Sequence, residues 1–272
     1  MSTLFIIATP IGNLQDISVR ALAVLRQVPV LACEDTRVTR KLLSHYEITR
    51  PSRLLSIHEY NEHQNVPRVV RLLSEGYDVA YVSDAGMPGI SDPGYLLVCS
   101  ARAAGHTVLV IPGASALLTA LVTSGLPMTG FTFLGFLPRQ SSRRRRLLAR
   151  MASVPETLVL YESPRRLGIL LADALAVLGD RRAAVTIDLT KIFETVEQDW
   201  LSALSARYRD IVRGEATVII SGLLPKFCRG SSLAENEQAV KRTQECIANP
   251  LGQRRSRGQR GVDPQELARA KD

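Results

Sequence analysis

Aromatic residues and long apolar runs are scarce in this chain of 272 residues. Aromatic side chains make up 5% of the sequence, and no apolar run approaches the roughly 20 residues that a membrane-spanning helix needs. The first ten residues, MSTLFIIATP, have neither a basic leader nor enough apolar residues for a signal peptide. We therefore expect a protein with no membrane association that stays in the cytoplasm.

Paired cysteines and several common catalytic motifs are also missing. His58 and His63 lie in HEYNEH, a spacing that keeps them off the shared helix face that a zinc protease requires. No GxGxxG, Walker loop or GxSxG elbow is present, which argues against the usual dinucleotide, ATP and hydrolase sites. We expect free thiols in a reducing compartment and no metal site, because no paired spacing relates Cys33, Cys99, Cys228 and Cys246.

Positive charge is in modest excess, with a formal net charge of +8, and it is unevenly distributed. Four consecutive arginines occupy 143–146, and the C-terminal segment contains Arg254, Arg255, Arg257 and Arg260. The excess favours a polyanionic partner such as RNA. Four adjacent arginines point to all sides of a helix, so phosphate contact and simple solvation remain alternatives.

The hydrophobic pattern predicts two α/β domains, over 1–115 and 116–222, followed by a basic and mobile tail over 223–272. In the first domain the pattern predicts a mainly parallel sheet, with strands at 4–8, 30–33, 78–82 and 107–111 and helices at 18–27, 66–76 and 92–104. In the second it predicts strands at 131–136, 157–161, 183–189, 191–196 and 216–221 and helices at 142–151, 163–178 and 200–208. The tail lacks any sustained apolar period.

The segment SDAGMPGISDPG, residues 83–94, directly follows one of these strands. Its end fits a turn in which Asp92 caps a helix and Pro93 takes the first helical position. That interpretation leaves Asp84, Gly86 and Pro88 unexplained. A rigid, glycine-rich loop at the carboxyl end of a parallel strand is typical of a ligand site. Four other loops with small or polar residues also follow strands, and together they predict a cleft on one rim of the sheet: TPIGNLQD (9–16), EDTR (34–37), PGASA (112–116) and 162–166.

These loops, together with SGLP, FLGFLPR, YESP and LTKIFE, closely resemble the bacterial 16S ribosomal RNA cytidine 2′-O-methyltransferases, a branch of the tetrapyrrole methylase superfamily. The resemblance runs from about Leu4 to Gly222. It implies two α/β domains of the tetrapyrrole methylase type with S-adenosyl-L-methionine in the cleft between them, and a homodimer. It also implies methyl transfer to a cytidine 2′-hydroxyl of 16S ribosomal RNA in the small ribosomal subunit.

Carried over to this sequence, the resemblance implies a cofactor site made of Pro10, Asp84, Met87, Ser115, Ala116, Glu162, Ala216 and Thr217. Asp84 can accept a hydrogen bond from a ribose hydroxyl or an ammonium group. We expect Gly86 and Gly113 to belong to the same site, because a glycine removes the Cβ atom that would obstruct the ligand.

Methyl transfer to a hydroxyl also needs a group that removes its proton. In the LTKIFE element Lys191 is the candidate base, if burial or neighbouring cations lower its pKa. Candidates for orienting the sugar or stabilising that lysine are Glu34, Asp35, Arg37 and Glu194. The alternative is that Lys191 and Glu194 have no catalytic role and form an exposed ion pair, which would contribute well under about 1 kcal/mol to stability.

Two departures from the family pattern bear on RNA contact. Where the family usually has Arg-Glu-Leu-Thr-Lys, this chain has Ile187, Asp188, Leu189, Thr190 and Lys191, and the tail lacks the periodicity of the family's small helical module. Two other functions remain open. One is methylation of a tetrapyrrole carbon on the same fold, and the other is a catalytically silent protein that binds RNA or assists ribosome assembly.

Overall fold

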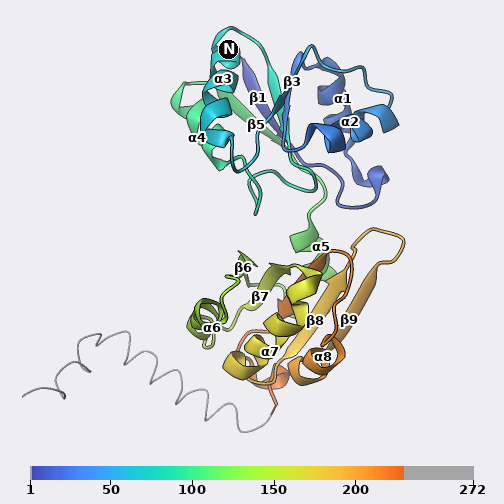
Figure 1. Cartoon of the computed structure of the whole chain (residues 1–272), viewed down its shortest axis with the longest axis vertical. Helices are drawn as coiled ribbons and strands as arrows, with labels where there is room; N and C mark the ends of the chain where they lie inside the picture. Colours follow the sequence, from blue (N-terminus) through green and yellow to red (C-terminus); the bar gives the residue numbers. More distant parts are fainter. Residues whose placement is uncertain (1, 230–272) are drawn as a thin grey trace, which may run out of the picture.

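The computed structural model describes residues 2–229, which form two domains built on two separate five-stranded sheets (Figure 1). All strands of the first sheet are parallel, in the order β3-β2-β4-β1-β5. Its strands are β1 (Thr3–Ile7), β2 (Val30–Cys33), β3 (Arg53–Ser56), β4 (Val79–Val82) and β5 (Thr107–Ile111). The carboxyl ends of parallel strands lie at one edge, so the loops that follow them gather there.

Helices cover both faces of the first sheet: α1 (Val19–Gln27), α2 (Thr36–His45), α3 (Glu62–Ser74) and α4 (Tyr95–Ala103). One buried apolar cluster joins the sheet to α1 and α2, and another joins it to α3 and α4, which lie on the opposite side in Figure 1. The predicted cap of α1 is present, because the Ser18 side chain accepts a hydrogen bond from the Ala21 N–H at 3.1 Å.

The second sheet is mixed, in the order β6-β7-β10-β8-β9, with only the β6–β7 pair parallel. Its strands are β6 (Phe131–Phe136), β7 (Thr157–Glu162), β8 (Arg182–Ile187), β9 (Thr195–Trp200) and β10 (Ala216–Ile220). One face carries α6 (Ser141–Arg150), α7 (Leu167–Leu178) and α8 (Leu201–Arg207), whose apolar side chains form the largest cluster of this domain. Helix α5 (Ala116–Thr123) packs on the other face and connects the two domains (Figure 1).

The structure confirms the two α/β units and the parallel first sheet, but several local predictions were wrong or incomplete. Helices α2 and α5 and strand β3 were not expected. Helix α4 begins at Tyr95 instead of residue 92. Strand β9 begins at Thr195, so Lys191–Glu194 lies in a loop instead of the strand predicted over 191–196.

The four consecutive arginines lie on α6 in unlike environments. Arg144 is 2% exposed, and its guanidinium contacts the buried Asp173 of α7 at 2.5 Å. Arg145 contacts the other oxygen of the same carboxylate, while Arg143 and Arg146 are exposed. The alternatives of phosphate contact and solvation therefore apply to Arg143 and Arg146, whereas Arg144 is part of the core of its domain.

The structure describes the first seven residues of the predicted tail, 223–229. Residues 223–229 pack on the second domain, where the Leu223 N–H donates to the Val154 carbonyl at 2.8 Å and the Arg229 N–H donates to the Asp180 carbonyl at 2.9 Å. The rest of the predicted tail, 230–272, with its arginines and Cys246, lies outside the described residues. Within 2–229, Cys33, Cys99 and Cys228 are free thiols, no helix is long and apolar enough to cross a bilayer, and no cluster of metal-ligating side chains occurs.

Candidate active site

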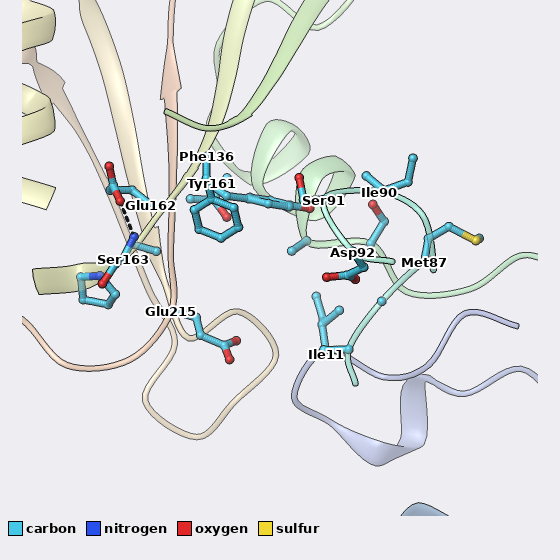
Figure 2. Close-up of a pocket in the computed structure, with 17 residues that line it drawn as sticks. Ile11, Met87, Ile90, Ser91, Asp92, Phe136, Tyr161, Glu162, Ser163 and Glu215 are labelled. Atoms are coloured by element: carbon cyan, nitrogen blue, oxygen red, sulfur yellow. Dashed lines mark hydrogen bonds between the residues drawn. The ribbon is translucent and has the colours of Figure 1, made fainter. Parts of the chain in front are cut away.

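A cleft of about 390 Å³ lies between the two domains (Figure 2). The first domain contributes Ile11 and the glycine-rich loop after β4. The second contributes Phe136, the end of β7 and the start of β10. Figure 2 labels side chains of both domains that line the cleft, among them Ile11, Met87, Asp92, Phe136, Tyr161 and Glu215.

Backbone hydrogen bonds fix the two loops that form the floor of the cleft. The Thr9 N–H donates to the Gly86 carbonyl at 2.9 Å, and the Gly86 N–H donates to the Thr9 carbonyl at 3.1 Å. Gly86 has φ +81°, a conformation that L side chains rarely adopt. The loops after β1 and β4 are therefore joined at this point, with the buried Pro10 next to the bridge.

Seven of the ten residues predicted to bind the cofactor line this cleft: Gly86, Met87, Ser115, Ala116, Glu162, Ala216 and Thr217. Asp84 and Gly113 line two neighbouring pockets instead. Gly113 serves packing, because a Cβ atom there would lie 3.0 Å from the Ala8 Cβ, and Gly86 serves loop conformation. That the two glycines also keep space open for a ligand stays a prediction.

Most of the predicted catalytic residues line a second pocket of about 370 Å³, at the carboxyl ends of β2, β3 and β4. It contains Glu34, Asp35, Arg37 and Asp84, together with Thr36, Ser56 and His58. Asp35 is the N-cap of α2, accepting from the Arg37 N–H at 2.7 Å, and its Oδ2 lies 2.6 Å from the Arg37 guanidinium. These hydrogen bonds from Arg37 lower the pKa of Asp35 to about 2.

Glu34 and Asp84 are held against each other by backbone contacts in this second pocket. The Asp84 carboxylate accepts from the Asp35 N–H at 3.0 Å, and the Glu34 carboxylate accepts from the Asp84 N–H at 3.3 Å. Burial raises the pKa of both carboxyl groups, despite these hydrogen bonds. Glu34 is thus a carboxylate whose basicity is increased by its surroundings.

Lys191 and Glu194 lie in the loop that follows β8. The Lys191 ammonium is 3.0 Å from an oxygen of Asp188 and 3.0 Å from an oxygen of Glu215. Burial acts to lower the pKa of Lys191, but the hydrogen bonds to Asp188 and Glu215 outweigh it and the pKa is raised. The low pKa on which the predicted base role depends is absent, and Lys191 is a cation here. Glu194 accepts from the Thr190 N–H at 2.6 Å.

The β8–β9 loop also contacts the first domain. The Asn13 N–H donates to the Thr190 hydroxyl at 3.0 Å. A Cβ atom on Gly12 would lie 2.6 Å from both the Thr190 Oγ1 and the Lys191 Cγ, so only glycine allows this approach. Lys191 is consequently brought to the edge between the two domains, where Ile192 and Phe193 are 94% and 82% exposed.

Sequence reasoning missed Asp92, Tyr161 and Glu215 as polar residues of the cleft. Asp92 was expected to cap a helix, but Gly94, with φ +134°, takes that position and Asp92 lines the cleft (Figure 2). Tyr161 accepts a hydrogen bond from the Leu117 N–H at 3.0 Å, which joins β7 to the start of α5. The SDPG sequence signalled that Asp92 belongs to a turn but not which way its side chain points, and nothing in the sequence singled out Tyr161.

The chain is similar in sequence to proteins of known name. A protein of Halalkalibacterium halodurans named ribosomal RNA small subunit methyltransferase I is 45% identical over 221 residues, covering 81% of this chain and 76% of that protein. A protein of the same name from Xylella fastidiosa strain Temecula1 is 48% identical over 224 residues, covering 81% of each.

Solved structures show the fold. The methyltransferase CobJ matches with a TM-score of 0.63 at 16% identity, over 82% of this chain and 95% of that one. Diphthine synthase matches with a TM-score of 0.62 at 15% identity, over 89% of this chain and 95% of that one. The family model of the tetrapyrrole (corrin/porphyrin) methylases matches residues 3–205. The chain therefore belongs to the tetrapyrrole methylase family, and within it to the ribosomal RNA small subunit methyltransferase I proteins.

Proposed function

We propose that this chain transfers a methyl group from S-adenosyl-L-methionine to the 2′-hydroxyl of a cytidine in 16S ribosomal RNA of the small subunit. The observation that carries the proposal is the identity of 45% and 48% to two proteins named ribosomal RNA small subunit methyltransferase I, over 81% of this chain. Likeness to the solved structures, at 15–16% identity, supports only the fold and therefore does not favour a tetrapyrrole substrate.

The cleft residues fit the cofactor. Ile11, Met87, Phe136 and Tyr161 give the cleft apolar and aromatic walls, as an adenosyl group requires, and a carboxylate suits its positive charge. When bound, S-adenosylmethionine supplies a methyl group on a positively charged sulfur. The remaining requirement on the protein is to position the ribose hydroxyl, exclude water and accept the hydroxyl proton.

Within the predicted catalytic set, we assign the proton acceptor to Glu34. Burial raises its pKa, which makes Glu34 a stronger base than Asp35, whose pKa of about 2 reflects its bonds to Arg37. Lys191 is a cation between two carboxylates, and Arg37 is exposed. We assign both to binding the RNA backbone, and Glu194 to holding the loop that carries Lys191.

Exposed side chains at the edge of the cleft suit a single-stranded RNA substrate. Phe193 and Ile192 project beside Lys191, and an exposed aromatic ring offers a surface on which an unpaired base can stack. We further propose a cytoplasmic homodimer, in agreement with large exposed apolar side chains on β5 and α5: Leu109, Val110, Leu118 and Val122.

The proposal is tested on small subunits from cells that lack the gene. The purified protein with labelled S-adenosylmethionine should methylate these subunits, and nuclease digestion with mass spectrometry should find the label on a cytidine ribose. Subunits from cells that carry the gene are the control and should accept little label. Binding to subunits without any cofactor turnover would instead support the silent RNA-binding protein, and label on a base would contradict the ribose assignment.

A further inference from the structure

Three carboxylates line the cleft between the domains: Asp92, Glu162 and Glu215. An oxygen of Glu162 lies 2.5 Å from the Arg166 guanidinium. An oxygen of Glu215 lies 3.0 Å from the Lys191 ammonium. Within residues 2–229, no lysine, arginine or histidine nitrogen lies within 4.0 Å of an Asp92 oxygen. Among the described residues, Asp92 is thus the cleft carboxylate without a cation beside it.

Asp92 is fixed in place by the loop that carries it. The Gly89 N–H and the Tyr81 hydroxyl both donate to the Pro93 carbonyl, at 3.1 and 3.2 Å. The Gly94 N–H donates to the Glu62 carboxylate at 3.1 Å. These bonds hold both residues after Asp92, and its side chain points into the cleft in Figure 2. Its position is therefore set before any ligand arrives.

In the part of the chain that the structure describes, the groups around Asp92 provide no compensating positive charge. Glu34 beyond β2 and Asp84 of the same loop are carboxylates, and Tyr81 of β4 and Tyr161 of β7 are phenols whose pKa values burial raises. Burial, together with the charges of Glu34 and Asp84, raises the pKa of Asp92 to about 7, against a hydrogen bond from Ser83 that lowers it. Without a ligand, the raised pKa of Asp92 leaves part of the carboxyl group protonated near neutral pH.

We propose that Asp92 binds the positive charge of the cofactor, the sulfonium or the ammonium of its methionyl part, and that Asp84 does not. This inference rests on the proposed function, because it takes S-adenosylmethionine as the ligand of the cleft. The sequence favoured Asp84 for a cofactor contact, but its carboxylate accepts from the Asp35 N–H and lines the neighbouring pocket. Asp92 and Asp84 belong to one loop, and the structure directs them to different pockets.

The proposal links cofactor binding to proton release. Only the ionised carboxylate attracts a cation, so binding must displace the proton from the protonated fraction of Asp92. Affinity should rise between pH 5.5 and 7.0, on the order of tenfold, over a range in which the cofactor's amino group stays cationic. A protein cation in the same place would remove this dependence.

The experiment is isothermal titration calorimetry of the full chain with S-adenosylmethionine, in buffers of different ionisation enthalpy and at several pH values. The wild type should release a fraction of a proton near pH 6.5. Asp92→Asn should bind roughly tenfold or more weakly at pH 7 and show little pH dependence. Asp84→Asn, the matched variant on the same loop, should keep most of the affinity and a pH dependence that is shifted to lower pH, because the charge of Asp84 helps to raise the pKa of Asp92. Asp92→Glu, which keeps the charge, should keep the proton release.

Two further ligands distinguish the sources of the positive charge. S-adenosylhomocysteine has the ammonium but a neutral sulfur, and sinefungin carries an amine near the place of the sulfonium methyl. If Asp92→Asn weakens S-adenosylmethionine and sinefungin but spares S-adenosylhomocysteine, the partner is the sulfonium. If Asp92→Asn loses affinity equally for all three ligands, the partner of Asp92 is the ammonium.

Other outcomes overturn the inference. Unchanged affinity in Asp92→Asn removes Asp92 from the site, and loss of affinity only in Asp84→Asn restores Asp84. Loss of the pH dependence in Glu34→Gln, with Asp92 intact, would assign the titration to Glu34. A wild-type protein that binds no S-adenosylmethionine would contradict the proposed function itself, which is a separate result from binding without proton release.

Discussion

Asp92 should lower the stability of the ligand-free protein at neutral pH. A carboxyl group with a raised pKa in the folded state binds its proton more tightly there than in the unfolded chain. Its contribution is therefore most favourable below the unfolded pKa and is lost as pH rises toward about 7. We expect Asp92→Asn to melt at a higher temperature than wild type at pH 7.5, with a smaller difference at pH 5. A lower melting temperature at both pH values would contradict an uncompensated charge at this position.

Glu34 and Lys191 give the second prediction at the scale of single residues. Glu34→Gln should reduce single-turnover methyl transfer roughly 10²- to 10⁴-fold, the range for loss of a general base, while cofactor affinity stays near wild type. Transfer by the wild type should decline as pH falls through the raised pKa of Glu34, because protonation removes the base. Lys191→Arg should keep much of the rate, since the proposed role needs only a positive charge.

The opposite pattern would reverse these two assignments. If Lys191→Ala loses transfer at saturating RNA, Lys191→Arg does not restore it and Glu34→Gln is nearly normal, then Lys191 is the base and must separate from Asp188 and Glu215 when RNA binds.

On helix α6, we expect substitutions of arginines that are adjacent in sequence to have different effects, because their surroundings differ. Arg144→Ala removes the buried one of the two arginines that contact Asp173 and should reduce the free energy of unfolding by up to about 3–5 kcal/mol, measured by urea denaturation. Burial would raise the pKa of Asp173, but hydrogen bonds from Arg145 and Arg144 outweigh it and lower the pKa. The stabilisation is therefore present above the unfolded pKa of Asp173 and is lost as pH falls through its folded pKa.

The exposed arginines of the same helix should affect RNA and not folding. Arg143→Ala combined with Arg146→Ala should leave the unfolding midpoint near wild type, because neither residue is buried. If these residues contact phosphates, the double variant binds small subunits more weakly and with a shallower salt dependence. An unchanged salt dependence would mean that both arginines are only solvated.

Elements that a simple periodicity defines could be predicted from the sequence, and turns that depend on unusual backbone angles could not. The pattern gave β5 at Thr107–Ile111 and α1 with its Ser18 cap, since alternation and capping are local properties. The start of the strand predicted over 191–196 was wrong, because Asp188 and Thr190 adopt φ of +52° and +65°, which turn the chain before β9. The start of α4 moved because Gly94, and not Asp92, caps it.

The same limit applies to the candidate site. Loops after parallel strands must share one rim, so the sequence placed most of the cleft residues together. It could not distinguish Asp84 from Asp92, because the direction of each side chain depends on long-range contacts. Ser91, beside Asp92, has φ +63° and packs close to Gly135 of β6 in the other domain. A pattern of neighbouring residues does not encode such a contact.

At the scale of the whole molecule, the two domains have largely separate cores. One apolar cluster fills the second domain and two lie on the faces of the first, while a smaller cluster packs α5 and Ile11 on the second sheet. Between the domains, the structure shows individual hydrogen bonds such as the one from the Asn13 N–H to the Thr190 hydroxyl at 3.0 Å. Without a ligand, we therefore expect the unfolding of one domain to be only weakly coupled to the unfolding of the other.

The walls of the cleft come from both domains, so a ligand bound there contacts both. Such a ligand couples the unfolding of one domain to the unfolding of the other. Scanning calorimetry of the cofactor-free protein should give two transitions, or one that is broader than a two-state process. A ligand that needs both walls binds neither domain alone, so at 100 times its dissociation constant it adds about 2.7 kcal/mol to the cost of opening either one. The two transitions should then merge into a single sharper one, and the cooperativity of unfolding becomes a measure of cleft occupancy that needs no RNA.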